Sequence, residues 1–168
     1  MRQADIRRIV VGVEDSFAGL RALRVAVAMA RSNGAAVHAV RVWARGERGP
    51  GGFASWFDEM ERIAANVITA AFAKSMGGRP DDLPVVATTL VGSPGPALVD
   101  YAYRDDDLLV VGATGGWWPG SLRPSVPRYC VAHARCPVVV VPADVFARQA
   151  RRAATARAIR RDLAHLAD

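Results

Sequence analysis

The stretch from Gly112 to Ser125 carries the residues whose types and spacing are best suited to chemistry in this chain. An apolar run, residues 108–111, stops at Gly112, a loop with further glycines follows, and Ser125 opens a segment of helical character. Glycine lets a backbone take positive φ and approach a ligand closely, and the first amides of a helix have no partner within the helix. Because the helix dipole adds positive charge at that end, the arrangement predicts an anion site, with phosphate as the natural occupant.

The spacing of this loop resembles the nucleotide loop of the universal stress protein family. Gly112, two residues, Gly115, and later a Ser that precedes Val126 follow that family's pattern of Gly, two residues, Gly, nine residues, Gly, then Ser or Thr. The N-terminal half, IVVGVEDSFAGLRALRVAVAMARSNGAAVHAVRVW, is similar to the family's first strand, helix and second strand. The resemblance covers about residues 6–142.

The loop departs from the family pattern at its end. Eight residues separate Gly115 from Pro124, which stands where the family has its third glycine, so the loop is one residue short. Pro124 and Pro127 both lack an amide hydrogen, and both favour a helix that begins near Ser125, since the first turn tolerates proline. We therefore expect the helix to form and phosphate binding to be weakened.

The remaining sequence predicts the elements that must position this loop. Apolar runs separated by helical segments, each run almost unbroken, indicate a parallel sheet covered on both faces. Residues 44–55 are expected to be a Gly-rich connection without helix or strand. The predicted strands are 9–13, 37–43, 85–91, 108–111 and 138–141, and the predicted helices run from Ser16 to Gly34, from Trp56 to Met76, through Ala97, Leu98 and Tyr101, and onward from Ser125.

The fold class is therefore α/β, a single Rossmann-like domain with a five-stranded parallel sheet and helices on both faces. The resemblance implies the strand order 3-2-1-4-5, which makes strands one and four neighbours. Ligands of such folds bind beyond the carboxyl ends of the strands, where the strand order reverses. The two strands that end in glycine, at Gly12 and Gly112, are those two, which supports a site there.

The resemblance also implies an adenine-nucleotide site. In the family, an acidic residue after the first strand contacts the nucleoside, and a valine on the second strand packs on the base. The carried-over binding residues are Gly12, Val13, Glu14, Val42, Gly112, Gly115, Ser125 and Val126. The implied ligand is ATP or a related nucleotide. Adjacent Glu14 and Asp15 would call for Mg²⁺ or Arg beside a polyphosphate, unless Asp15 and Ser16 only begin the helix.

Patterns of several enzyme classes are missing. The chain has no G-x-x-x-x-G-K-[ST] and no G-x-G-x-x-G after the first strand. Ser16, His38 and His133 have no triad context, so no catalytic residue is predicted. Cys130 and Cys136 flank His133, but a fourth ligand is not found, and buried packing is the expected role of both thiols; no metal site is predicted.

Charge divides the chain into a core, residues 1–142, and a basic C-terminal helical tail, residues 143–168. The net charge is +6, and the tail contributes half of it, with six Arg against three Asp. No apolar stretch approaches the roughly 18 residues that cross a bilayer, and the N-terminus is too polar for a secretory signal. We expect a cytoplasmic protein with no membrane partner, and nucleic acid is not the expected ligand.

Three functions follow as hypotheses. The first is a universal stress protein that binds an adenine nucleotide and acts through an unknown protein partner in a stress response, without turnover. The second is a dimeric interaction module of the same fold that binds no nucleotide, favoured by Pro124 and the short loop. The third is a nucleotide-using enzyme. In the family, the last strand, Val138–Val141 here, commonly pairs with its copy in a homodimer.

Overall fold

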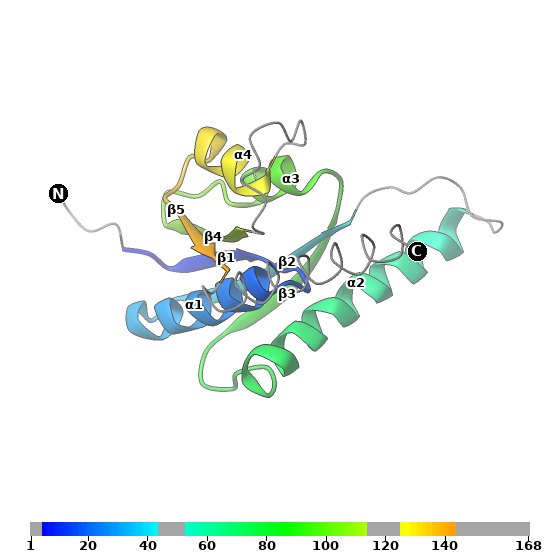
Figure 1. Ribbon diagram of the computed structural model, residues 1–168, viewed down its shortest axis with the longest axis horizontal. Coiled ribbons are helices and arrows are strands. Elements are labelled where there is room, and N and C mark those ends of the chain that lie inside the picture. The colour runs from blue at the N-terminus through cyan, green and yellow to red at the C-terminus, as the bar shows by residue number, and fades with distance from the viewer. Residues whose placement is uncertain (1–4, 44–52, 114–124, 144–168) are drawn as a thin grey trace, which may run out of the picture.

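The computed structural model describes residues 5–43, 53–113 and 125–143, apart from the side chains of residues 53–56. Five parallel strands form one sheet in the order β3-β2-β1-β4-β5, as predicted (Figure 1). The elements in chain order are β1 (Arg8–Gly12), α1 (Phe17–Asn33), β2 (Ala36–Trp43), α2 (Phe53–Met76), β3 (Val85–Val91), α3 (Pro94–Tyr101), β4 (Asp107–Ala113), α4 (Val126–His133) and β5 (Val138–Pro142).

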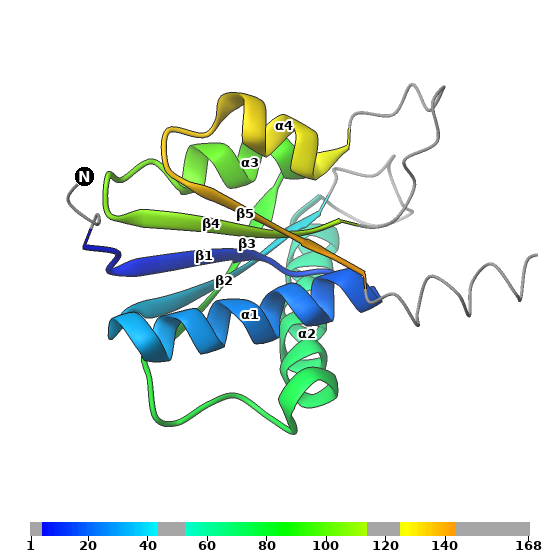
Figure 2. The ribbon, with the colours of Figure 1, turned by 60° about the vertical axis from the view of Figure 1, so that its left-hand side comes forward.

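The helices cover the sheet from both sides. Figure 2 shows α1 and α2 on one face and α3 and α4 on the other. Successive side chains of a strand point to opposite faces, so β1 divides its residues between two cores. Ile9 and Val11 join the cluster under α1 and α2, whereas Val10 joins the cluster under α3 and α4.

Helix ends lie where polar and glycine residues predict them. Ser16 caps α1, because its side chain accepts a hydrogen bond from the Gly19 amide, and Gly34 ends that helix with a φ of 64°. Ser125 caps α4 in the same way and accepts from the Arg128 amide. The predicted helix start near Ser125 is therefore confirmed.

Strands β1 and β2 differ from their predicted bounds by one residue, and two further boundaries differ by more. Helix α2 begins at Phe53, although residues 44–55 were expected to hold no helix. Glycine content sets this limit, since the last glycine of the connection is Gly52 and residues 53–55 have no helix breaker among them. Strand β4 does not end at Gly112 but continues to Ala113, because both residues pair with β5.

Strand β3 is less covered than its apolar sequence predicts. Its Val86 and Val91 side chains are exposed, because β3 is the edge strand of the described sheet, beside β2. An apolar run thus indicates a strand, but the neighbouring elements decide how much of it is buried.

A buried ion pair joins the amino ends of β1 and β4, and the sequence patterns did not predict it. The Arg8 guanidinium donates to both carboxylate oxygens of Asp107, each at 2.6 Å. Arg8 also donates to the carbonyl of Tyr101, and the Arg104 amide donates to Asp107. The hydrogen bond to Asp107 raises the pKa of Arg8 against the opposing effect of burial.

Among the helices of the described ranges, none has the length of apolar sequence that a bilayer crossing requires. The predicted tail, residues 143–168, lies outside the described residues beyond Ala143.

Replacement of Arg8 by Met is expected to lower the free energy of unfolding by about 3–5 kcal/mol, because the fully buried Asp107 carboxylate would lose its counter-charge. Arg31→Met is the matched control. Arg31 makes the same two-bond contact with Asp82, but that pair is half exposed, so its loss should cost less than about 1 kcal/mol. Urea unfolding measures the free energy of unfolding of each variant. Equal losses in Arg8→Met and Arg31→Met would contradict the conclusion that burial makes the Arg8–Asp107 pair the more important one.

Candidate functional site

The candidate site lies at the carboxyl edge of the sheet, where β1 and β4 are neighbours. Figure 2 shows the ends of these strands and the first turns of α1 and α4 on the same side of the molecule. The strand order reverses at this pair, since β2 and β3 lie beyond β1 and β5 lies beyond β4. The topological condition for a ligand crevice in an open α/β sheet is therefore met.

Gly112 brings the backbone of α1 against β4. A β-carbon at this position would lie 2.7 Å from the Ala18 carbonyl carbon and 2.8 Å from the Gly19 nitrogen. A side chain is therefore excluded by helix backbone, which cannot move alone. At Gly12, on the other face of the sheet, the nearest atom would be the end of the Leu98 side chain at 2.9 Å. Gly112 thus places the first turn of α1 at the site.

The Glu14 side chain lies along that first turn. Its carboxylate accepts a hydrogen bond of 2.9 Å from the Ser16 hydroxyl, which in turn accepts from the Gly19 amide. A β-carbon at Gly19 would lie 2.4 Å from Cγ of Glu14, so glycine at position 19 makes room for the glutamate. Glu14 is half-buried, and its carboxylate is held as a hydrogen-bond acceptor at the end of β1.

Two cationic side chains hold the β1–α1 connection on either side of Glu14. The Arg41 guanidinium donates to the Val13 carbonyl at 3.1 Å, and the Lys74 ammonium lies 2.7 Å from the Asp15 carboxylate. Neither residue is among the site residues predicted from the sequence. Arg41 did carry a signal, because it is a charged residue within the otherwise apolar second half of β2, whereas Lys74 gave none beyond being the chain's single lysine.

The start of α4 offers fewer donors than an ordinary helix. The Arg128 amide is already bound to the Ser125 side chain at 3.2 Å, and Pro127 has no amide hydrogen. Within this first turn, Val126 has an amide hydrogen, and that amide is not bound to the Ser125 side chain. A serine hydroxyl has one donor and two acceptor positions, so exposed Ser125 retains a proton that an anion can accept.

The structure brings most of the predicted site residues to one edge. Gly12, Val13, Glu14 and Gly112 lie around the ends of β1 and β4. Val42 is buried in the cluster under α3 and α4, against which Val126 packs, so these two line the same side of the sheet. Gly115, like Pro124, lies outside the described residues.

The other candidate groups of the sequence do not join this edge. The His38 ring nitrogen is 2.8 Å from the Tyr101 hydroxyl, and burial lowers the pKa of this histidine. Cys130 and Cys136 are buried as predicted, and burial raises the pKa of Cys130 to about 11. In the described part of the chain, no three His, Cys, Asp or Glu side chains form a group that suits a metal ion.

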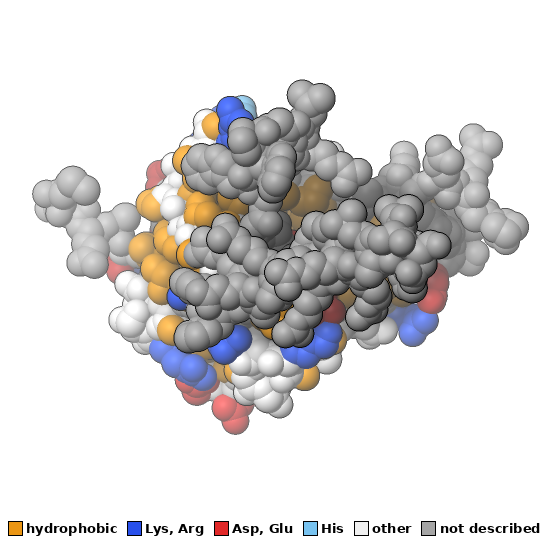
Figure 3. All heavy atoms as spheres, viewed as in Figure 1, with side chains coloured by type: hydrophobic (Ala, Val, Ile, Leu, Met, Phe, Trp, Pro, Cys, Tyr) orange, Lys and Arg blue, Asp and Glu red, His pale blue; other side chains and the backbone are white. Residues whose placement is uncertain are grey.

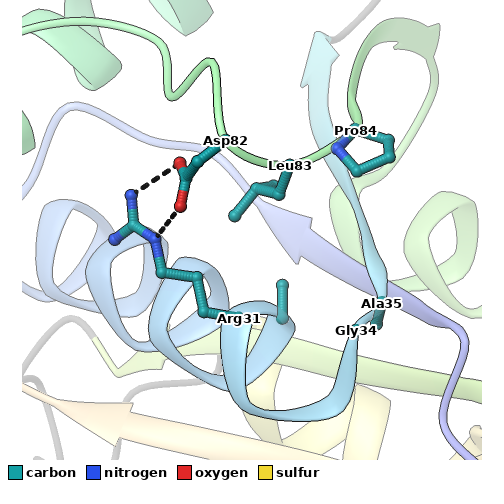
Figure 4. A pocket seen from close by; sticks show the side chains of 7 residues that line it. Arg31, Gly34, Ala35, Asp82, Leu83 and Pro84 are labelled. Atoms are coloured by element: carbon teal, nitrogen blue, oxygen red, sulfur yellow. Dashed lines mark hydrogen bonds and ion pairs between the residues drawn. The ribbon is translucent and has the colours of Figure 1, made fainter.

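A hollow of about 460 Å³ lies at the opposite end of the sheet, beside the start of β2 and β3 (Figure 4). Its charged side chains, Arg31 and Asp82, are bonded to each other, and the rest of its lining is apolar or glycine. This surface presents no unpaired charge to a ligand. The carboxyl edge therefore remains the candidate site, and its acceptor and donors suit a ligand that carries hydroxyl groups and negative charge.

Comparison with known proteins identifies a family. Residues 5–142 match the sequence model of the Universal stress protein family. A universal stress protein of Mycobacterium tuberculosis is 32% identical over 142 residues, which are 79% of this chain and 46% of the relative. The chain thus spans about half the length of the curated relatives it matches.

Solved structures agree with this match. A universal stress protein in complex with cAMP is 26% identical, with a TM-score of 0.56 over 83% of this chain and 98% of that one. The universal stress protein from Archaeoglobus fulgidus in complex with dAMP is 25% identical, with a TM-score of 0.52 over 80% and 97%.

Gly112→Ala is expected to destabilise the protein by about 1–3 kcal/mol, because the new methyl group would overlap the α1 backbone. Gly12→Ala is the control on the neighbouring strand, where the end of the Leu98 side chain can turn away, and it should cost less than about 1 kcal/mol. Free energies of unfolding in urea compare the two. If Gly12→Ala lowers the free energy of unfolding more than Gly112→Ala does, the close approach of α1 to Gly112 is contradicted.

Proposed function

The chain belongs to the universal stress protein family, and on that premise we propose that it binds an adenine nucleotide at the carboxyl ends of β1 and β4. The observation that carries the proposal is the Glu14 carboxylate, held by Ser16 beside the first turn of α1. It is a fixed acceptor at the point where the strand order reverses, and the hydroxyl groups of a ribose are suitable donors.

The other site residues have complementary roles in this proposal. Val42 supplies an apolar surface for the base, and Gly12 and Val13 lead to Glu14 at the end of β1. Ser125, the Val126 amide, Gly112 and Gly115 contact the phosphate, with Gly115 assigned from its position in the sequence pattern alone.

Two solved relatives support this ligand class. One universal stress protein at 26% identity is in complex with cAMP, and one at 25% identity is in complex with dAMP. For this chain we propose ATP or a related adenine nucleotide, with Mg²⁺ as a further ligand of a polyphosphate. The restricted donors of α4 favour weaker phosphate binding than a full glycine loop would give.

We propose further that the protein acts in the cytoplasm by binding and not by turnover, and that nucleotide occupancy regulates its contact with a protein partner in a stress response. The second candidate is an interaction module of the same fold without nucleotide. It is favoured by Pro127, which removes an amide donor from the first turn of α4.

Calorimetric titration with ATP and Mg²⁺, AMP and cAMP tests nucleotide binding. We expect micromolar affinity for at least one nucleotide and a loss of about tenfold or more in Glu14→Ala, because a charge-assisted hydrogen bond would be removed. Asp82→Asn, an exposed carboxylate at the other end of the sheet, is the control and should leave affinity unchanged. No heat with any nucleotide, from folded protein, would favour the module without nucleotide.

We also propose a homodimer through β5. Within the described residues this strand ends the sheet and pairs with β4, and its outer edge has no strand partner there, while the Pro142 carbonyl accepts a hydrogen bond from Arg21. Val140 is 39% exposed, and Figure 3 shows hydrophobic side chains gathered on the flank where β5 lies in Figure 1. A second copy would cover this apolar edge.

Val140→Lys is expected to convert the dimer to a monomer, because a charged side chain would enter the apolar contact. Val131→Lys is the control, since Val131 is a more exposed valine, at 60%, on α4. Light scattering after size exclusion gives the molecular mass of each variant. A wild-type monomer at tens of micromolar, or a Val140→Lys dimer, would refute the proposed interface.

A further inference from the structure

We propose that Arg41 is a positioning residue that fixes the Glu14 carboxylate and thereby sets the preference of the site for ribose over deoxyribose. The inference rests on the proposed function, since it concerns how the same site reads the sugar of an adenine nucleotide. Its carrying observation is the hydrogen bond from the Arg41 guanidinium to the Val13 carbonyl, one residue before Glu14.

Arg41 replaces a backbone partner that the sheet does not provide. The Val13 amide still donates to the Val40 carbonyl at 2.8 Å, but β1 ends at Gly12 and the chain then turns toward α1. The Val13 carbonyl is therefore at the point where regular pairing with β2 stops. A backbone carbonyl away from water requires a donor, and the side chain of Arg41 supplies one.

The face on which Arg41 lies makes this contact possible. Its neighbours Val40 and Val42 belong to the cluster under α3 and α4, so alternation along β2 places Arg41 on the opposite face. Val13 belongs to the cluster on that opposite face, under α1 and α2. Arg41 thus reaches the end of β1 from the α1 and α2 side, on the face opposite to Val42.

The contact limits the freedom of Glu14 at its backbone. Beyond Glu14, the Ser16 hydroxyl holds the carboxylate, and Gly19 makes room for the glutamate side chain against the first turn of α1. Arg41 holds the chain on the preceding side. The carboxylate is thus restrained from two sides, and without Arg41 the Val13 carbonyl loses the hydrogen-bond donor that holds the peptide between Val13 and Glu14.

Lys74 provides a second and weaker tether on the other side of Glu14. Its ion pair with Asp15 is exposed, at 52% and 56% of the two side chains, so solvent screens the attraction. We therefore assign the main positioning role to Arg41, whose side chain is half-buried.

A fixed carboxylate distinguishes sugars because a hydroxyl that donates to it is lost in the deoxy ligand. A hydrogen bond to a charged group in a held geometry corresponds to about tenfold or more in affinity. If the carboxylate is free to move, ordering it offsets part of this gain, and the preference falls.

The test measures dissociation constants of AMP, 2′-deoxy-AMP and 3′-deoxy-AMP by calorimetry. Wild-type protein is expected to prefer AMP over one deoxy ligand by about tenfold or more. Arg41→Met should reduce this ratio to about threefold or less, and Arg41→Lys should restore part of it. Arg62→Met is the control, because Arg62 pairs with Glu59 on the surface of α2, and it should keep the wild-type ratio.

A double variant distinguishes a specific effect of Arg41 on Glu14 from a non-specific loss of structure. In Glu14→Ala the ratio should approach one, and adding Arg41→Met should then change the ratio no further, since both changes remove the same interaction. Circular dichroism checks that each variant folds. If Arg41→Met does not fold, Arg41→Lys takes its place, and its ratio is expected to lie below that of the wild type.

The outcomes distinguish this inference from the proposed function. No binding of any nucleotide by folded wild-type protein would overturn both. Binding with a ratio near one in the wild type, or an unchanged ratio in folded Arg41 variants, would overturn the positioning role and leave nucleotide binding intact. Support for the positioning role would be a lower AMP preference in Arg41→Met and an unchanged preference in Arg62→Met. In the Glu14→Ala background, adding Arg41→Met would leave the preference unchanged.

Discussion

The approach of the α1 backbone to Gly112 is the constraint on which the candidate site depends. Because position 112 has no side chain, the first turn of α1 lies directly on β4. That contact sets the place where the chain must turn after β1, and the turn carries Glu14. Ser16 then serves two purposes, since its hydroxyl caps α1 and holds the Glu14 carboxylate. Helix packing, helix capping and the ligand-binding acceptor are therefore parts of one local arrangement.

The two ends of the central strand pair have different roles. At the amino ends, the buried charges of Arg8 and Asp107 are paired with each other, and Tyr101 and Arg104 add further hydrogen bonds. At the carboxyl ends, charged groups are half-buried or exposed and hold the backbone of a turn. Buried charges that are fully paired confer a fixed geometry, whereas accessible charges can exchange partners with a ligand. This difference is the physical reason to place function at the carboxyl edge.

Much of the fold could be predicted because its signals are local. Apolar runs marked the strands, and the caps Ser16, Gly34 and Ser125 marked the helix ends. The strand order came from the family resemblance and not from periodicity. The errors occurred where local signals compete with pairing: β4 continues through Gly112 because β5 pairs with it, and β3 is exposed at Val86 because it is an edge strand.

By itself the sequence determined the elements, their order along the chain, and the residue types at the carboxyl ends of β1 and β4. Only the tertiary structure decided what those residues touch. The sequence pattern predicts Gly112 as a glycine of a phosphate loop, and in the fold the absence of a side chain there also makes room for the backbone of α1. Arg41 lies 28 residues after Val13, and Lys74 lies 59 residues after Asp15. Contacts across such separations depend on helix packing and strand register, which no local pattern encodes.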